Sequence, residues 1–374
     1  MKILLVGNYL PDDQQSMQRF ANMLRDGLKA RGQDVQLLQP RPILGRKNLG
    51  PALRKWAAYV DKYVFFPREL KRSASSADVV HICDHSNAMY VSAVNGRPHL
   101  VTCHDLLAVR GALGEKTDCP ASFTGKILQR WILNSLRKAQ MVACVSSATR
   151  ADLLRLAGDE MSDRSCVVML GVAGTLGRKS SPEGDAMLAN LPRPAGRPFL
   201  LNVGSNLRRK NREGALRIFQ KVSKEFDCDL IFAGEPLSEE LKRVKKEIGL
   251  NGRVIEVARP SDAMLEALYN GAFALLYPTR YEGFGWPAIE AQTCGCPVIS
   301  SQSTSIPEVV GDSALLRSPD DETGFVDDIL SLTKGSLRQQ LIARGYENVK
   351  RFTPGRMVND YLELYQKVCT RNSS

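Results

Sequence analysis

Two series of short apolar runs, each run followed by polar or helical sequence, dominate the chain. The first series lies at residues 2–7, 34–39, 77–83, 98–105 and 139–147, and the second at residues 199–205, 228–234, 253–258, 273–278 and 296–301. Buried parallel strands form short continuous apolar runs, and a crossover must follow each strand before the next can pair in parallel. The pattern therefore predicts an α/β protein with two doubly wound, Rossmann-like parallel sheets in tandem.

A stretch rich in glycine, proline and serine separates the two series. It covers residues 173–198, which we expect to link an N-terminal domain of residues 1–172 to a C-terminal domain of residues 199–352. The 374 residues are enough for two domains of ordinary size. Ligands of such sheets bind outside the carboxyl ends of the strands, so we expect the domains to face each other across a ligand-binding cleft.

The composition is that of an ordinary globular protein, with 43% hydrophobic and 24% charged residues. Nine cysteines are scattered through apolar stretches, which indicates buried thiols in a reducing compartment more than disulfides or a metal site. The apolar run at the N-terminus is too short for a secretory signal, and no stretch is long enough to span a membrane. We therefore predict a cytoplasmic protein.

The net charge of +11 is placed unevenly. Nine Lys and Arg residues accompany only two acidic residues between Arg41 and Arg72, and the aromatic residues among them are Trp56, Tyr59, Tyr63, Phe65 and Phe66. Basic residues interleaved with aromatic ones suit the surface of an anionic membrane. Nucleic acid is one alternative partner, and a solvated helix whose aromatic residues pack into its own core is another explanation. We predict membrane contact through residues 41–72 and no nucleic-acid partner.

The first strand–helix loop of each series, GNYLPD and GSNLRRK, lacks the G-x-G-x-x-G fingerprint of dinucleotide binding, and no P-loop motif occurs. This disfavours a nicotinamide-dependent enzyme and a P-loop hydrolase. The second loop contains Arg208, Arg209 and Lys210. The planar guanidinium of arginine and the compact ammonium of lysine both suit a diphosphate. A solvated basic turn would explain these three residues taken alone.

The stretch YEGFGWPAIEA places two carboxylates, Glu282 and Glu290, eight positions apart around a glycine-rich turn. It follows an apolar strand, and Pro287 suits the first turn of a helix. Backbone N–H groups of this turn would donate to sugar hydroxyls and phosphate oxygens, while Glu282 could hold a hexose hydroxyl and Glu290 a ribose diol. From the spacing alone, a solvated Glu282 and a Glu290 that complements the helix dipole explain the pattern equally well.

The same stretch, continued through QTCGCPVISSQSTSIPEVVGDSALL, resembles the E-x7-E signature region of the retaining glycosyltransferases of family four, whose fold is called GT-B. The resemblance runs from about residue 199 to 318, and VTCHDL and CVSSATRADLL extend it more loosely into the first half. It implies that Glu290 binds the ribose, that the basic turn binds the diphosphate, and that Glu282 and the turn after it hold the donor sugar. The donor-binding residues it implies are Arg209, Lys210, Gly283, Phe284, Gly285, Trp286 and Glu290.

By the same resemblance, His104 and Glu282 are the catalytic residues, and Asp105 orients His104 or contacts the acceptor. A histidine that caps or fills the core at a strand end is the alternative for His104. The family pattern has a serine at the strand end where Ser146 and Ser147 stand, and we interpret these two residues as helix N-caps.

The resemblance implies a front-face hexosyl transfer that retains anomeric configuration, in which the leaving diphosphate helps to deprotonate the acceptor hydroxyl. Basic groups at the diphosphate replace a metal in this fold, so we expect no metal and no cofactor. It also implies that the last helix, within residues 353–374, packs back on the first domain.

Two departures from the family pattern concern phosphate binding. The first loop lacks the usual glycine pair, and we expect the backbone N–H of Ser16 to take its place. Ser205 stands where many relatives have an arginine, which shifts the phosphate role to Arg208 or Arg209.

Together these features predict a retaining glycosyltransferase that moves a hexose, with a weak preference for mannose, from a GDP- or UDP-linked donor to a glycan or lipid-linked acceptor. We expect it to act in cell-surface polysaccharide synthesis at the inner face of the membrane. The alternatives are a sugar-nucleotide epimerase of the same fold and a non-catalytic nucleotide-sugar binding protein.

Overall fold

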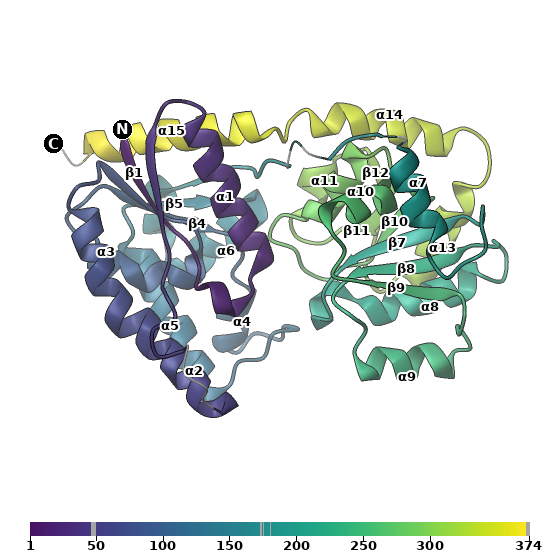
Figure 1. Ribbon diagram of the computed structural model, residues 1–374, viewed down its shortest axis with the longest axis horizontal. Helices are drawn as coiled ribbons and strands as arrows, with labels where there is room; N and C mark the ends of the chain where they lie inside the picture. Colours follow the sequence, from purple (N-terminus) through teal and green to yellow (C-terminus); the bar gives the residue numbers. More distant parts are fainter. Residues whose placement is uncertain (46–49, 173, 175, 180, 372–374) are drawn as a thin grey trace. The chain divides into compact units, whose positions relative to one another are not determined.

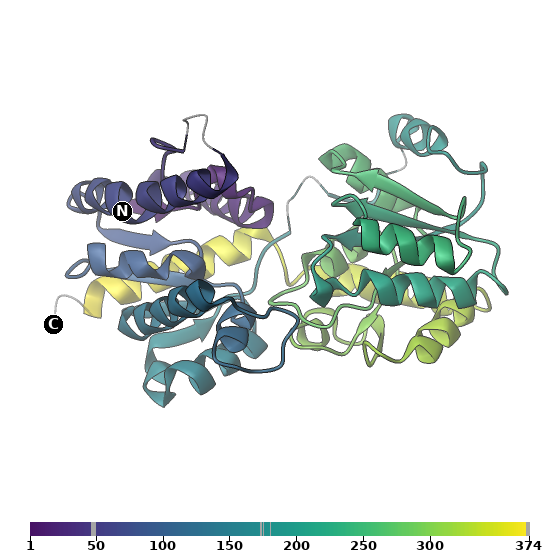
Figure 2. The same cartoon turned by 90° about the horizontal axis from the view of Figure 1, so that it is seen from below.

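The computed structural model describes residues 1–45, 50–172, 174, 176–179 and 181–371, without the side chains of Pro51, Ala52, Arg54 and Arg371. The chain forms two compact units. The first unit contains Met1–Gly171 and Pro354–Ser374, and the second contains Val172–Thr353. Each unit has its own parallel sheet, with helices on both sides of the strands (Figures 1 and 2).

The sheet of the first unit has six parallel strands in the order β2-β1-β3-β4-β5-β6. The strands are β1 (Lys2–Val6), β2 (Asp34–Leu38), β3 (Val79–Ile82), β4 (His99–Cys103), β5 (Met141–Cys144) and β6 (Ser165–Val167). The helices are α1 (Gln15–Lys29), α2 (Pro51–Val60), α3 (Phe66–Ala74), α4 (Leu107–Ala112), α5 (Phe123–Lys138), α6 (Ser147–Ala157) and α15 (Pro354–Arg371). Short helices of other types are the 3-10 helices Leu10–Asp12, His85–Ala93 and Asp159–Arg164 and the π-helix Asp61–Phe65 between α2 and α3.

The sheet of the second unit has six parallel strands in the order β12-β11-β10-β7-β8-β9. The strands are β7 (Phe199–Gly204), β8 (Asp229–Gly234), β9 (Val254–Ala258), β10 (Ala274–Tyr277), β11 (Val298–Ser301) and β12 (Ala314–Arg317). The helices are α7 (Pro182–Ala189), α8 (Arg212–Val222), α9 (Glu239–Glu247), α10 (Asp262–Gly271), α11 (Trp286–Thr293), α12 (Ile306–Val310), α13 (Glu322–Ser331) and α14 (Leu337–Val349), and Arg208–Lys210 forms a 3-10 turn.

The apolar runs of the sequence form the buried strands as predicted, and the helical spacing of α1 is confirmed by its buried face of Phe20, Leu24 and Leu28. β1, β3, β4 and β5 carry only buried residues from their second position onward, which explains why they form continuous apolar runs. Two strands were not predicted from the sequence, β6 and β12. Both lie at the edge of a sheet, where burial is incomplete and the apolar signal is correspondingly weak.

The C-terminal helix α15 packs on the first unit through a buried polar network, which makes this unit discontinuous in sequence. The Tyr365 hydroxyl lies 2.8 Å from Nδ1 of His81, and Nε2 of the same ring lies 2.7 Å from Oγ1 of Thr102. Thr102 in turn pairs with the Tyr361 hydroxyl at 2.8 Å. Burial lowers the pKa of His81 to about 3, so the ring stays neutral.

Residues 173–198, which the sequence predicts to be a linker, belong to the second unit and contain the helix α7. Ser181 caps this helix by accepting a hydrogen bond from the N–H of Gly184, and the preceding segment is held on α10 where the N–H of Lys179 donates to Asn270 Oδ1 at 3.0 Å. The composition of the segment did not indicate this helix, because it averages over a short capped element. Residues 173, 175 and 180 of the segment lie outside the described residues.

Candidate functional site

In the second sheet, β7 and β10 are neighbours, and the strand order runs outward in opposite directions from this pair. β7 is the first strand of the unit and β10 the fourth. The loops that follow two such strands diverge to opposite faces and leave room for a ligand at their carboxyl ends. Here the two loops are tied together: the N–H of Arg280 donates to the Arg209 carbonyl at 2.7 Å, and the Thr279 hydroxyl lies 2.9 Å from the same oxygen. The basic turn and the glycine-rich turn predicted from the sequence therefore meet at one point.

Glu282 is the centre of this meeting point. Its Oε1 accepts hydrogen bonds from Lys210 Nζ at 2.7 Å and from the Tyr277 hydroxyl at 2.6 Å, and the Thr279 hydroxyl lies 2.8 Å away. Its Oε2 accepts from Arg209 Nη1 at 3.3 Å. Two cations and one carboxylate leave a net charge of +1 in a buried cluster, which suits a phosphate ligand.

The Glu282 carboxylate remains ionised in this environment. Burial raises its pKa, but the charges of Lys210 and Arg209 and the hydrogen bonds from Lys210 and Tyr277 outweigh burial and lower the pKa to about 2. Because Glu282 is 6% exposed, the alternative of a solvated side chain is wrong.

The turn after Glu282 is rigidly held. The N–H and carbonyl of Glu282 pair with Oγ1 of Thr304 at 3.0 and 2.8 Å, and the Ser305 hydroxyl lies 2.9 Å from the carbonyl oxygens of Glu282 and Phe284. Phe284 is buried against Phe352 at a ring distance of 5.7 Å. These contacts hold the start of the predicted donor-binding turn, residues 282–284, against the loop after β11.

Gly285 ends this turn in a conformation that favours glycine. Its φ of 100° lies in the left-handed region, and a Cβ atom there would come within 2.5 Å of Ile306 Cδ1. The helix α11 begins at the next residue, Trp286, with a proline in its first turn as predicted.

Glu290 lies in α11, where it is 3% exposed and accepts a hydrogen bond at 2.9 Å from the hydroxyl of Tyr269 in α10. Burial and the neighbouring carboxylate raise the pKa of Tyr269, so it remains a neutral donor. Arg208 of the basic turn is exposed, in contrast to Arg209 and Lys210, and no ion pair links it to another described residue.

In the first unit, His104 follows β4 and is 6% exposed. Its Nε2 lies 2.9 Å from the Cys83 carbonyl, which fixes a proton on Nε2, and Phe20 contacts the ring edge-on at 5.0 Å. Burial lowers the pKa of His104. Asp105 accepts a hydrogen bond at 3.1 Å from the N–H of Leu107, the first residue of α4.

Ser16, Ser146 and Ser147 of the first unit lie at helix starts. Ser146 caps α6 by accepting a hydrogen bond from the N–H of Thr149, which confirms the N-cap interpretation, and Ser147 is the first residue of the helix. Ser16 is exposed in the first turn of α1.

The sequence did not predict several residues that the fold brings to these sites. Tyr277 and Thr279 surround Glu282, and Tyr269 contacts Glu290. In the first unit, Asp84 and His85 follow β3 directly. A search for polar residues at the ends of the predicted strands would have found Asp84 and His85, because the apolar run of residues 77–83 ends just before them.

Two features were searched for over the described part of the chain. No group of three or more His, Cys, Asp or Glu residues there is arranged to hold a metal ion, and the metal-independence expected from the resemblance remains a prediction. No helix there is long and apolar enough to cross a membrane.

Comparison with known sequences relates both halves of the chain to glycosyltransferases. Residues 185–348 match the family model of glycosyl transferases group 1, and residues 17–173 match that of glycosyltransferase family 4. O-antigen chain mannosyltransferase B of Escherichia coli is 31% identical over 61% of this chain, and the match spans 61% of that relative's length. Alpha-maltose-1-phosphate synthase of Mycolicibacterium smegmatis is 26% identical over 79% of this chain and 80% of its own.

Solved structures share the architecture over the whole chain. A sucrose-phosphate synthase from Thermosynechococcus elongatus has a TM-score of 0.81 at 20% identity and covers 99% of this chain and 100% of its own. HepE of Anabaena, in complex with UDP and glucose, has a TM-score of 0.74 at 16% identity and covers 100% of both chains. The fold is that of the GT-B glycosyltransferases, and each half of the chain matches a glycosyltransferase family.

Proposed function

We propose that the chain transfers a hexose, with retention of anomeric configuration, from a nucleoside-diphosphate sugar to a hydroxyl of a glycan or lipid-linked acceptor in cell-surface polysaccharide synthesis. The cluster of Arg209, Lys210 and Glu282 at the strand-order reversal of the second sheet carries this proposal. Arg209 and Lys210 bind the diphosphate and stabilise the charge that develops as it leaves. Their positive charges do this without a metal.

The same cluster assigns the two carboxylates. When the diphosphate takes over part of the charge of Arg209 and Lys210, Glu282 becomes available as an acceptor for hexose hydroxyls, held in place by Tyr277. We assign Glu290 to the ribose diol, with its carboxylate oriented by the 2.9 Å hydrogen bond from Tyr269 to Oε2. We assign the backbone N–H groups of residues 283–286 to the sugar and phosphate oxygens, and His104 of the first unit, by the resemblance, to catalysis. Arg208 and the N–H of Ser16 are further phosphate contacts, and Asp105 an acceptor contact.

Nucleotide binding tests the donor assignment. We expect one of UDP, GDP, ADP and dTDP to raise the melting temperature in the presence of EDTA, because a ligand at about 100 times its dissociation constant adds about 2.7 kcal/mol of stability. No shift with any of the four nucleotides, with or without magnesium, would overturn the donor site.

Product analysis tests the reaction class. We expect a nucleoside-diphosphate sugar and an acceptor alcohol to give a glycoside whose anomeric proton coupling matches that of the donor. A sugar-nucleotide epimerase would instead convert the donor without an acceptor, and a non-catalytic binding protein would give no product. An inverted product would contradict retention.

We also propose that the first unit binds the anionic inner face of a membrane, through a surface wider than the predicted residues 41–72. Rings in contact run from Trp56 through Tyr59 and Tyr63 to Trp131 of α5, with centroid distances of 5.8, 5.6 and 5.5 Å. On α5, Phe123, Ile127 and Trp131 recur every four residues and are 79, 55 and 44% exposed. Of the five predicted aromatic residues, Phe66 belongs to the core.

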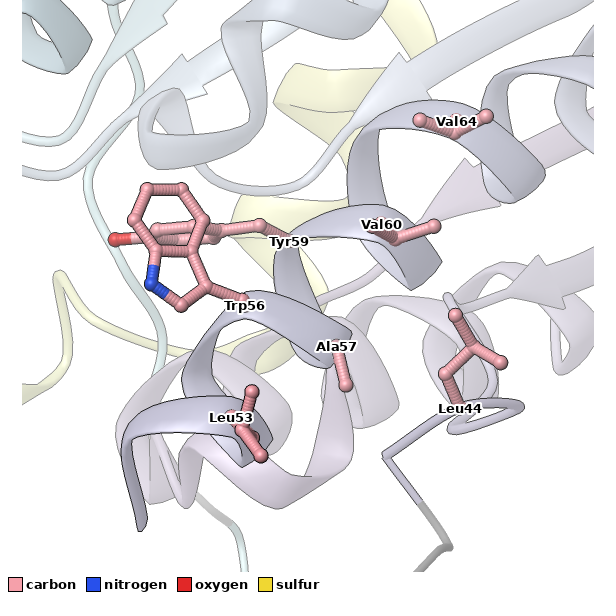
Figure 3. Close-up of a pocket in the computed structure, with 7 residues that line it drawn as sticks. All are labelled: Leu44, Leu53, Trp56, Ala57, Tyr59, Val60 and Val64. Atoms are coloured by element: carbon pink, nitrogen blue, oxygen red, sulfur yellow. The ribbon is translucent and has the colours of Figure 1, made fainter. Parts of the chain in front are cut away.

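An apolar hollow of about 470 Å³ opens beside this aromatic row (Figure 3). Its lining residues are Leu44, Leu53, Trp56, Ala57, Tyr59, Val60 and Val64. Its rim is anchored, because the buried Asp61 carboxylate accepts hydrogen bonds from the N–H groups of residues 43, 44 and 45 at 3.1, 2.9 and 3.0 Å. Residues 46–49 of the predicted membrane segment, and the side chain of Arg54, lie outside the described residues.

Charge complementarity selects an anionic bilayer as the occupant of this surface. Lys55, Lys126 and Arg130 are exposed on the same two helices as the apolar residues. Each basic side chain near an anionic leaflet contributes about 1 kcal/mol, and exposed Trp and Phe insert at the headgroup level.

Vesicle sedimentation tests this surface. Changing Lys55, Lys126 and Arg130 to Gln should reduce binding to vesicles of phosphatidylcholine and phosphatidylglycerol. The matched control changes Lys242, Arg243 and Lys246 of α9 to Gln, which removes the same charges from an exposed helix of the second unit. Equal losses in the two triple variants would overturn the proposal in favour of a net-charge effect.

A further inference from the structure

Arg212, the first residue of α8, is a buried cation that the proposed transfer does not use. It is 3% exposed, and no carboxylate forms an ion pair with it among the residues that the structure describes. Burial lowers the pKa of Arg212 to about 10, against the charges of Glu235 and Glu256, so the guanidinium stays charged at neutral pH. A buried charge destabilises a fold unless hydrogen bonds compensate for it, so its partners indicate its role.

The guanidinium of Arg212 links the loops that follow β7 and β8. Its Nη2 donates to the carbonyl oxygens of Gly204 at 2.6 Å and Ala233 at 3.2 Å. Its Nη1 donates to the Glu235 carbonyl at 2.7 Å and to Oδ1 of Asn206 at 2.8 Å. β7 and β8 are neighbouring strands, so one side chain joins their carboxyl ends.

Asn206 strengthens the same link. Its N–H donates to Oε2 of Glu235 at 2.8 Å, and its Nδ2 donates to the Pro236 carbonyl at 2.5 Å. Because Oδ1 of Asn206 also accepts from Arg212, three groups of this asparagine hold the loop after β7 against the loop after β8. On its other side, the loop after β7 is held by the loop after β10, as described above.

Gly204 connects this anchor to the donor site. A Cβ atom on Gly204 would lie 3.6 Å from Cδ of Lys210, so the Lys210 side chain lies over the Gly204 backbone at van der Waals distance. Lys210 Nζ then reaches Oε1 of Glu282 at 2.7 Å and the Tyr277 hydroxyl at 3.0 Å. The carbonyl that Arg212 holds and the surface that supports Lys210 therefore belong to one residue.

We propose that Arg212 is a positioning residue of the donor site: it fixes the backbone from Gly204 to Asn206 so that Lys210 is directed toward the diphosphate. This inference rests on the proposed glycosyl transfer and deepens it, since it adds a group that prepares the phosphate site without touching the ligand. A site held in place before binding loses less conformational entropy when the ligand arrives, which raises affinity. The role depends on the fork of the guanidinium, because its N–H groups are directed at oxygens of two different loops.

The first test is Arg212→Lys, which keeps the positive charge but replaces the planar fork with a single ammonium. The probe is whichever of UDP, GDP, ADP and dTDP gives the largest rise in melting temperature, compared with its own nucleoside. We expect the Kd of the nucleoside diphosphate to rise about 10-fold, while the Kd of the nucleoside changes by about threefold or less. An equal rise for both ligands would show a general loss of structure, and the inference would be wrong.

A double-mutant cycle shows whether Arg212 acts through Lys210. Residues that act through one another give non-additive effects, so in a Lys210→Ala background Arg212→Lys should change the Kd of the nucleoside diphosphate by about threefold or less. Additive effects would mean that Arg212 acts independently of Lys210, which would overturn the inference.

Arg217→Lys is the matched control. Arg217 lies further along the same helix, where it forms ion pairs with Glu213 and Glu322 and its side chain is 38% exposed. None of its printed partners belongs to the loops after β7 and β8. We expect this variant to keep the wild-type Kd for the nucleoside diphosphate.

Asn206→Ala is a second variant for the case in which Arg212→Lys does not fold. Asn206 is only partly buried, and its truncation removes one acceptor of Arg212 and leaves the three carbonyl oxygens. We expect the same selective rise in the Kd of the nucleoside diphosphate, by about threefold to 10-fold. If folded Arg212→Lys, or Asn206→Ala in its place, binds the nucleoside diphosphate as tightly as wild type, the inference is wrong while the proposed function stands. A wild-type protein that binds none of the four nucleotides overturns both.

Discussion

The hydroxyl of Tyr269 donates a hydrogen bond of 2.9 Å to Oε2 of Glu290, joining two consecutive helices of the second unit through side chains that are both buried. A buried carboxylate has to be hydrogen-bonded, and here a neutral phenol from α10 occupies one of its oxygens. The partner thus fixes the rotamer of Glu290, which is the residue that we assign to the ribose.

Removing the carboxylate should weaken nucleotide binding. For Glu290→Ala we expect the Kd of the bound nucleoside diphosphate to rise about 10- to 100-fold, because a hydrogen bond to a charged group contributes about 1.5–3 kcal/mol. Tyr269→Phe should give a smaller rise, since the carboxylate remains but is less well oriented. Isothermal titration calorimetry measures both.

A ribose-specific control separates this role from a general loss of structure. The 2′,3′-dideoxy analogue of the same nucleotide should bind the wild-type protein and Glu290→Ala equally weakly. If the natural nucleotide also binds the two proteins equally, Glu290 does not contact the ribose.

The three basic residues of the turn after β7 should differ in their effect on phosphate binding. Arg209 and Lys210 are partly buried at Glu282, whereas Arg208 is exposed. We expect Arg209→Ala and Lys210→Ala to raise the Kd of the nucleoside diphosphate at least 10-fold, while the Kd of the uncharged nucleoside stays unchanged. For Arg208→Ala we expect the Kd of the diphosphate to change threefold or less. A dominant effect of Arg208→Ala would move the phosphate site out to the exposed side of the turn.

Glu282 should make the protein sensitive to acid. Its pKa is about 2 in the folded protein against an ordinary value of 4.5, so the carboxylate contributes its full stabilisation above pH 4.5 and loses it as the pH falls toward 2. The difference corresponds to about 3 kcal/mol at neutral pH. Glu282→Gln should therefore be less stable than wild type at pH 7, with a gap that narrows below pH 4.5.

Urea unfolding between pH 7 and pH 3 measures this gap. The control is Glu347→Gln, which changes an exposed carboxylate of α14 and should leave the pH dependence of the wild type unaltered. Parallel stability curves for wild type and Glu282→Gln would show that the ion pairs of Glu282 do not stabilise the fold.

The strands, and the two turns that carry the proposed donor site, could be predicted because their signals are local. Continuous apolar runs mark β7 and β10, and the stretch around Glu282 and Glu290 carries its own turn and helix-start residues. Contacts between residues that are far apart in the sequence could not be predicted. Nothing in the sequence places β7 beside β10, and this pairing is what brings Lys210 to Glu282 and Tyr277.

The same limit explains the residues that the sequence did not single out in the first unit. Asn8 and Asp84 are 76 positions apart and meet only because β1 pairs with β3. A strand order of the kind seen in the second sheet, in which the first strand pairs with the second and fourth, would have separated them. The buried Oδ1 of Asn8, which has no hydrogen-bond partner among the described residues, is likewise visible only in the folded structure.

Gly285 provides a test of the rigid turn between the two carboxylates. Gly285→Ala adds a Cβ atom at 2.5 Å from Ile306 Cδ1 on a residue whose φ is 100°, so both steric overlap and backbone strain oppose it. We expect a loss of about 2 kcal/mol or more in the free energy of unfolding, together with weaker nucleotide binding. Gly335→Ala is the matched control, because Gly335 has a φ of 63° but no atom within 4 Å of the added Cβ. It should lose only the strain energy and keep nucleotide affinity. If the two variants are equally stable and bind nucleotide equally, the turn adapts to its ligand, and donor binding does not depend on a backbone fixed in advance.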